Sequence, residues 1–199
     1  LGINEKGMGA FANYLTCDGW RVGFPRYLFS RLALTHETVD DATGAIDSLH
    51  RASSRNLMLM DGHGTAADLE TTPARTGRID PVNDIVVHAN HFEQPAMLSE
   101  ERADAAYLPN TRTRSATLRR LLDERHGELN PDQMQAILRD RSSFPHCLCR
   151  EEADIPEHDT VTFASVIARP SMGEMWVAVG PPNAHAYERY AFSSVTAGA

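Results

Sequence analysis

The chain has 199 residues, of which 42% are hydrophobic and 23% are charged, values typical of a globular protein with a sizeable core. Its formal net charge is −8 and its Lys and Arg residues are scattered, which argues against binding to a nucleic-acid backbone. The sequence has no run of about 18 apolar residues, so we expect no membrane span and no membrane partner.

Three cysteines, Cys17, Cys147 and Cys149, are too few for a disulfide framework. We therefore expect a reducing compartment and assign the protein to the cytoplasm. Cys147 and Cys149, with His146 beside them, could suggest a metal site. Structural zinc sites use C-x₂₋₄-C spacing and a second ligand pair elsewhere, so the spacing favours a packing role for these cysteines.

The first third of the chain predicts a strand–turn–strand unit over residues 2–15, with its turn at 4–7. A helix follows over residues 22–34, and Pro25 suits its first turn. Thr38 and Asp41 resemble a capping pair that opens a second helix. Residues 56–70 then predict a hairpin around a Gly-His-Gly turn.

The remainder of the chain begins with a predicted buried strand at 85–88 that ends near Asn90 and His91. Two helices follow, at 113–126, stopped by Gly127, and at 131–140, capped by Asn130. Residues 160–168 and 174–180 predict a second hairpin, and residues 191–199 a last short strand. Because strands and helices occur in blocks, the order favours an α+β fold with antiparallel sheets and helices on their outer faces. We predict one domain over residues 1–199.

Several polar residues lie where chemistry could occur, but each also has a structural explanation. Asn13 interrupts an apolar strand and could cap the strand end, and Asn90 could shape a turn. Arg112 and Arg114 are placed at a helix start, where a cation is unfavourable. Either an anionic group compensates there, or the charges are exposed. Taken singly, none of these residues identifies a function.

A metal-dependent enzyme is a further alternative, because the chain has nine histidines. Only His88 and His91 approach ligand spacing, and they lie at a predicted strand end rather than on a helix face. We expect no metal and no other cofactor.

Taken together and in order, the motifs resemble those of a known family. They are "GINEKGMGAFANYL", "FPRYLFSRLAL…TVDDATGAI", "NLMLMDGHGTAADLETTP", "HANHF", "PNTRTRSATLRRLL" and "CLCREE…TVTFASVIARPSMGEMWVAVGPP". They resemble the acyl-coenzyme A:6-aminopenicillanic acid acyltransferase branch of the cysteine N-terminal-nucleophile hydrolases, relatives of the choloylglycine hydrolases. The resemblance extends over essentially the whole chain. It implies a four-layer αββα sandwich, incomplete at its N-terminal side.

The resemblance also implies a chemistry. A cysteine exposed by self-cleavage would attack a non-peptide linear amide or an acyl thioester, and nothing in this chain matches that cysteine. We therefore interpret the chain as the C-terminal portion of a longer protein, with a partner chain expected if the precursor cleaves itself. Cys17 is internal and has no free α-amino group to act as its base. The rival hypothesis is a binding or structural protein that keeps the fold without the nucleophile.

The resemblance assigns catalytic roles to three residues. Asn90 matches the asparagine of the oxyanion hole, Asn13 matches a second asparagine of the bile salt hydrolase relatives, and Arg112 matches the site arginine. Thr111 replaces the serine usual before that arginine, and with His91 it is assigned to substrate binding. His91 could instead serve packing.

Overall fold

The computed structural model describes residues 1–151 and 161–193. It contains two antiparallel sheets, which confirms the predicted α+β class. The five strands of the first sheet lie in chain order: β1 (Gly2–Ile3), β2 (Gly9–Asn13), β3 (Arg55–Met60), β4 (Ala66–Thr71) and β5 (Thr76–Ile79). The second sheet has the order β6 (Ala164–Arg169), β7 (Glu174–Val179) and β8 (Glu188–Ala191).

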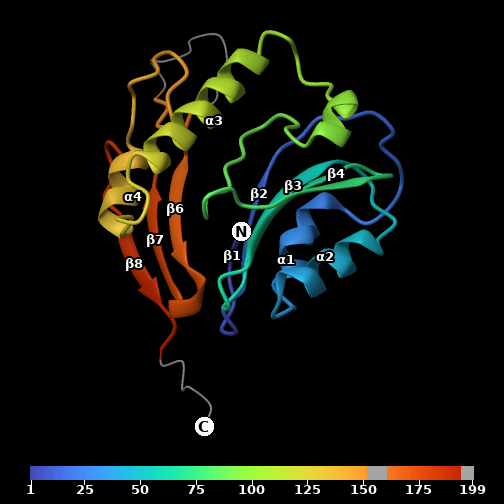
Figure 1. Cartoon of the computed structure of the whole chain (residues 1–199), viewed down its shortest axis with the longest axis horizontal. Helices are drawn as coiled ribbons and strands as arrows, with labels where there is room; N and C mark the ends of the chain where they lie inside the picture. Colours follow the sequence, from blue (N-terminus) through green and yellow to red (C-terminus); the bar gives the residue numbers. More distant parts are fainter. Residues whose placement is uncertain (152–160, 194–199) are drawn as a thin grey trace.

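Four α-helices flank these sheets: α1 (Phe29–Ala33), α2 (Val39–Asp47), α3 (Leu108–Asp123) and α4 (Pro131–Leu138). Short 3₁₀ helices cover Arg26–Leu28, Pro95–Glu100 and Pro170–Met172. Figure 1 shows α1 and α2 beside the first sheet, and α4 beside the second sheet on the other side of the molecule. Within the described part of the chain, no helix has the length and apolarity needed to cross a bilayer.

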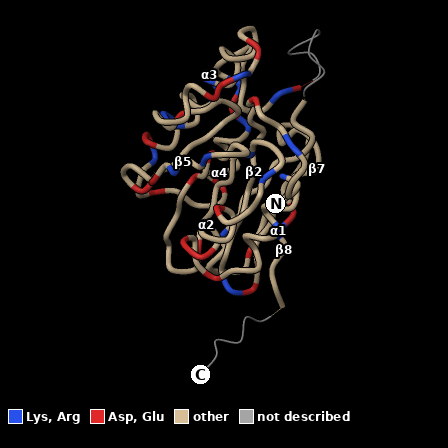
Figure 2. The backbone as a smooth tube through the Cα atoms, turned by 90° about the vertical axis from the view of Figure 1, so that its right-hand side faces the viewer, with Lys and Arg blue, Asp and Glu red and all other residues tan. Residues whose placement is uncertain are grey.

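The two sheets meet where the turn between β6 and β7 packs against β2. A Cβ atom added to Gly9 would lie 2.7 Å from Cγ of Pro170, closer than real side chains approach. Gly9 is therefore required by this contact rather than by its backbone angles. Figure 2 shows basic and acidic residues interspersed along the chain.

The main core lies between α1, α2 and one face of the first sheet. Side chains that point to this face alternate along each strand, as the two-residue period of a strand requires. They include Ala10 on β2, Leu57 and Leu59 on β3, and Ala67 and Leu69 on β4, all fully buried. The other face of the same strands carries Asn13, Asn56, Asp68 and Glu70 among apolar residues, and these four belong to the site described below.

Leu57→Ala is expected to lower the free energy of unfolding by about 2–5 kcal/mol, because it opens a cavity between the first sheet and the helices α1 and α2. Met60→Ala is the matched control, since Met60 lies on the same strand with 43% of its surface exposed. Urea unfolding of both variants checks this. Equal losses would show that the core is not centred on this face.

Two predicted helix caps are confirmed. Oγ1 of Thr38 accepts a hydrogen bond from the Asp41 backbone N–H at 3.1 Å, and Oδ1 of Asn130 accepts one from Gln133 at 3.0 Å. Both hairpins predicted from the sequence are also present, as β3–β4 and β6–β7. The last strand lies at Glu188–Ala191, earlier than predicted, and the predicted residues 194–199 lie outside the described part of the chain.

The prediction of a strand at residues 85–88 is wrong. Ile85 and Val87 are buried as expected, but they pack against Leu121, Leu122 and Ile137 of α3 and α4. The backbone here makes only an isolated bridge between Val82 and Ile85. This segment is therefore extended chain laid between the first sheet and α3, and its position depends on side-chain contacts.

The predicted start of α3 is also wrong. The helix begins at Leu108, so Arg112 and Arg114 lie in its second turn, where the unfavourable effect of the helix dipole on cations has largely faded. Pro109 in the first turn marks this earlier start. No anionic group is needed to explain the two arginines.

Candidate active site

Two asparagine side chains come together at the end of β2. Nδ2 of Asn13, the last residue of β2, donates a hydrogen bond to the backbone carbonyl of His88 at 3.1 Å. Nδ2 of Asn90 donates to the backbone carbonyl of Tyr14 at 3.2 Å. The two residues are 77 positions apart in the sequence, yet the segment 88–90 lies directly across the end of the strand. Nδ2 of Asn13 also lies 3.5 Å from Nδ1 of His88.

The amide of Asn90 is held on its other side by Arg114. Nη2 of Arg114 donates to Oδ1 of Asn90 at 2.8 Å, and Nε of Arg114 donates to Oδ1 of Asn110 at 3.0 Å. A guanidinium can only donate, so Oδ1 of Asn90 must face Arg114 on α3, and Nδ2 of Asn90 faces away from α3. Burial lowers the pKa of Arg114 from its ordinary value, and the hydroxyl of Tyr107 opposes that shift.

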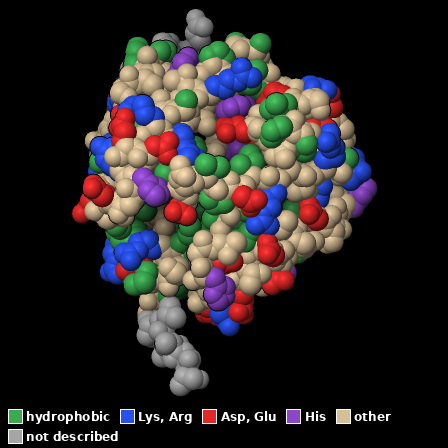
Figure 3. All heavy atoms as spheres, viewed as in Figure 1, with side chains coloured by type: hydrophobic (Ala, Val, Ile, Leu, Met, Phe, Trp, Pro, Cys, Tyr) green, Lys and Arg blue, Asp and Glu red, His purple; other side chains and the backbone are tan. Residues whose placement is uncertain are grey.

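Arg112, the arginine assigned to catalysis by the resemblance, has a different position. It is exposed and lines a cavity of about 670 Å³ between the segment 79–98 and α3. Ile85, Val87 and Leu98 contribute apolar walls to this cavity, and His91 contributes polar atoms. Figure 3 shows the molecule hollowed beside α3, with hydrophobic and charged side chains around the hollow.

Thr111 and His91 support the loop that carries Asn90. Thr111 is fully buried, and its Oγ1 accepts the backbone N–H of Asn90 at 2.6 Å. The same oxygen lies 3.1 Å from Nδ1 of His91, whose Nε2 is 3.5 Å from Glu93. Burial lowers the pKa of His91 against the opposing charge of Glu93. Thr111 therefore braces Asn90, while His91 also reaches the cavity; their assignment to substrate binding stays a prediction.

Sequence reasoning missed a buried polar cluster beside Asn13. Register aligns Asn13 with Asn56, and Asn56 with Glu70, on the face of the first sheet turned away from α1 and α2. Asp68 lies on the same face of β4, and Nδ2 of Asn56 donates to both of its carboxylate oxygens at 2.7 Å. Strand alternation could have placed these residues on one face, but it does not show what covers them.

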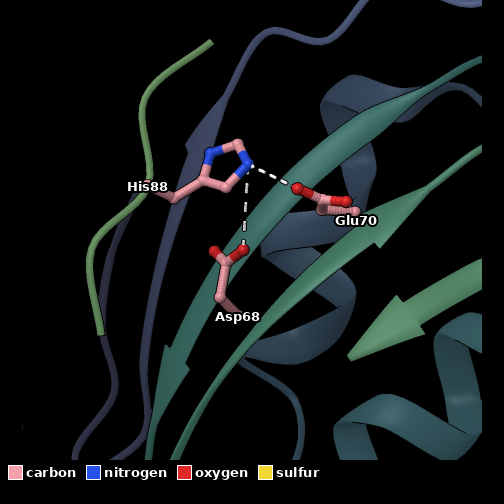
Figure 4. Close-up of side chains that lie close together, drawn as sticks. All are labelled: Asp68, Glu70 and His88. Carbon is pink, nitrogen blue, oxygen red and sulfur yellow. Dashed lines mark hydrogen bonds and ion pairs between the residues drawn. The ribbon is translucent and has the colours of Figure 1, made fainter. Parts of the chain in front are cut away.

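His88 covers this cluster from the segment 85–92. Its Nε2 lies 3.0 Å from Oε1 of Glu70 and 3.9 Å from Oδ2 of Asp68, and all three side chains are fully buried (Figure 4). Their ligand atoms lie within 4.8 Å of one another, so the group could in principle hold a metal ion, although the sequence predicted none. The hydrogen bonds they already make account for the arrangement without one.

Burial raises the pKa of Asp68 to about 6, against the opposing effects of His88 and Asn56. Burial alone would lower the pKa of His88, but its hydrogen bond to Glu70 and the charge of Asp68 outweigh this, so that pKa is raised. A buried carboxylate with a raised pKa binds its proton more tightly in the folded state than in the unfolded state.

Stability is therefore expected to fall as pH rises from about 4, the ordinary pKa of an aspartate, to about 6. The contribution of Asp68 is on the order of 3 kcal/mol. Asp68→Asn removes the titrating group, so the difference in unfolding free energy between wild type and variant should change across this range. Urea unfolding at pH 4, 5, 6 and 7 measures it, and a constant difference would contradict the raised pKa.

Two neutral amide donors held at one strand end suit the stabilisation of an oxyanion, the requirement of enzymes that act on acyl groups, although neither residue lines the cavity at Arg112. The comparison with protein families agrees with this class. The chain belongs to the acyl-coenzyme A:6-aminopenicillanic acid acyl-transferase family, whose model matches residues 1–184, and the resemblance recognised in the sequence is thereby confirmed. No individual curated protein matches the chain closely enough to count as a relative. The family suggests acyl-transfer or amide-cleaving chemistry on small-molecule acyl substrates.

Proposed function

We propose that the protein is a cysteine N-terminal-nucleophile enzyme that hydrolyses a non-peptide linear amide or transfers its acyl group. A coenzyme A thioester is an alternative acyl donor, and the proposed fold is the four-layer αββα sandwich. Hydrolysis is the favoured outcome because water is always available as acceptor. The observation that carries the proposal is the juxtaposition of the Asn13 and Asn90 amides in a chain of this family.

The nucleophile is proposed to lie outside residues 1–199. Cys17 is a poor candidate because it is buried, and burial raises the pKa of its thiol, which disfavours the reactive thiolate. Cys147 and Cys149 are fully buried as well. An upstream cysteine with a free α-amino group would supply both the nucleophile and its base.

In this mechanism the cysteine thiolate attacks the substrate carbonyl carbon, and the thiol proton passes to the α-amino group. The carbonyl oxygen becomes an oxyanion, and the remaining N–H groups of Asn13 and Asn90 donate to it. Neutral amides suit this role because they donate without titrating. The amino group then returns the proton to the departing amine, and water or an acceptor amine releases the acyl group.

The two arginines are proposed to act differently. Arg114 contacts Asn90 directly, so it is proposed to position the oxyanion donor. Arg112 remains a candidate for the catalytic role given by the resemblance, and its place at the cavity supports a contact with the substrate.

Acyl-enzyme formation tests the proposal. The protein is expressed with the coding sequence upstream of Leu1, incubated with p-nitrophenyl acetate and measured by intact mass spectrometry. We expect one acetyl group on an upstream cysteine, and no acetyl group after that cysteine is changed to alanine. A folded protein that shows no adduct, or no upstream cysteine, would support the nucleophile-free binding protein instead.

A further inference from the structure

The side chain of His88 has a hydrogen-bond acceptor against each ring nitrogen. Nδ1 lies 2.8 Å from the backbone carbonyl oxygen of Ala89, and Nε2 lies 3.0 Å from Oε1 of Glu70. A carbonyl oxygen carries no proton, so Nδ1 must be the donor in the first contact. Nδ2 of Asn13, itself a donor, lies 3.5 Å from the same Nδ1, and the shorter contact to Ala89 decides the assignment. The charge of the ring then depends on whether the second proton resides on Nε2 or on Glu70.

Three hydrogen-bond contacts converge on the carboxylate of Glu70. Oε1 accepts the backbone N–H of Glu93 at 2.6 Å, and Oε2 accepts the backbone N–H of Gln94 at 3.2 Å. Two backbone donors and the ring of His88 thus converge on one carboxylate, and hydrogen bonds to the charged form of an acid stabilise that form. Oε1 of Glu70 is therefore the acceptor that faces Nε2 of His88.

The same contacts join the two ends of the segment that carries Asn90. Glu70 binds His88 at the start of residues 88–94 and the N–H groups of Glu93 and Gln94 at their end. The carbonyl of His88 also accepts the Asn13 amide. Because this segment belongs to no sheet, it lacks the ladder of backbone hydrogen bonds that would otherwise fix it.

We propose that His88 and Glu70 form a buried imidazolium–carboxylate pair that clamps residues 88–94 onto the first sheet and positions the amides of Asn13 and Asn90. His88 and Glu70 are positioning residues, since both side chains are fully buried. The catalytic value of this positioning rests on the proposed function. The charge of His88 and the clamp itself do not, so they can be tested without any activity.

Nitrogen NMR of protein labelled with ¹⁵N-histidine tests the charge. In wild type at pH 7.5 we expect both ring nitrogens of His88 to be protonated, with the signal assigned by its loss in His88→Gln. Glu70→Gln keeps the size of the side chain but removes the charge, so we expect a neutral ring. Asp68→Asn is the comparison variant: Asp68 is 3.9 Å from Nε2 and makes no hydrogen bond to it, so its loss should lower the pKa of His88 less than the loss of Glu70 does.

The other groups that face His88 are Asp68 on β4 and Glu93 and His91 on its own segment. A neutral His88 in wild type at pH 7.5 would overturn the proposal. Equally, zinc or another divalent metal bound at one equivalent, with a His88 signal that moves on chelation, would show that a cation rather than a proton occupies the cluster.

Hydrogen exchange tests the clamp. We expect the amides of Glu93 and Gln94 to exchange at least tenfold faster in Glu70→Gln than in wild type, and close to the wild-type rate in Asp68→Asn. Unchanged exchange in Glu70→Gln would refute the clamp. If Glu70→Gln does not fold, the wild-type ring signal and exchange in His88→Gln still decide the matter.

In the active protein, Glu70→Gln should lower kcat by about tenfold or more with little change in KM. A displaced amide donor reduces the stabilisation of the transition state more than it reduces the binding of the substrate. Absence of any acyl-enzyme in wild type would remove the proposed function while leaving the NMR and exchange results to judge the clamp.

Discussion

Asn90→Ala is expected to lower kcat by about 10²–10³-fold in the active protein, the loss seen when one oxyanion donor is removed from an acyl-transfer enzyme. The amide of Asn90 is fixed from two sides, by the Tyr14 carbonyl and by Arg114. Such a donor is oriented before the reaction begins, so its loss should act on kcat rather than on KM. Steady-state kinetics with a p-nitrophenyl ester substrate measure it.

Asn183→Ala is the matched control, because Asn183 is an exposed asparagine after β7 whose side chain contacts Glu151. It should leave kcat unchanged. Self-cleavage and the folded state should remain detectable in Asn90→Ala, since the residue is only partly buried. Turnover equal to wild type would remove Asn90 from the oxyanion hole.

The local parts of the fold could be predicted from the sequence because their determinants are neighbours in the chain. The Thr38 and Asn130 caps each depend on one hydrogen bond across three residues. The β3–β4 and β6–β7 hairpins likewise follow from strand alternation around short turns. These features were predicted correctly without any knowledge of tertiary contacts.

The secondary-structure predictions failed where a buried apolar segment is not a regular strand, and where a short strand has little apolar pattern. Residues 85–88 are apolar because they pack on α3 and α4, and a short apolar run cannot distinguish a strand from such a buried segment. Strand β5 was missed because "TGRI" is short and contains Gly77. That glycine is required by packing, since an added Cβ would lie 2.6 Å from Cγ of Met97.

In the candidate site, too, some residues could be predicted from the sequence and others could not. The resemblance indicated Asn13 and Asn90 as partners, and the structure brings them to the same strand end. The network of Asp68, Glu70 and His88 was not predicted. Alternation places Asp68 and Glu70 on one face, but only the tertiary fold lays His88 over them and makes that face buried.

The second large effect is expected from substitution of Arg114, and it distinguishes the role of Arg114 from that of Arg112. Arg114→Met should lower kcat by about 10–100-fold, because it removes the donor to Oδ1 of Asn90 and frees that amide to rotate. Arg112→Met should change kcat by less than about threefold and act mainly on KM, because Arg112 is exposed at the cavity. Kinetics of both variants with the same substrate make the comparison.

Loss of stability must be separated from loss of positioning in Arg114→Met. The variant leaves the carbonyl oxygens of Asn90 and Asn110 without their charged donor, at a stability cost of about 1.5–3 kcal/mol per bond. Activity is therefore measured well below the melting temperature and normalised to the folded fraction. Arg114→Lys should recover only part of the activity, because an ammonium group cannot bridge both amides as a planar guanidinium does. The reverse pattern, with Arg112→Met inactive and Arg114→Met active, would return the catalytic role to Arg112 and reduce Arg114 to a packing residue of α3.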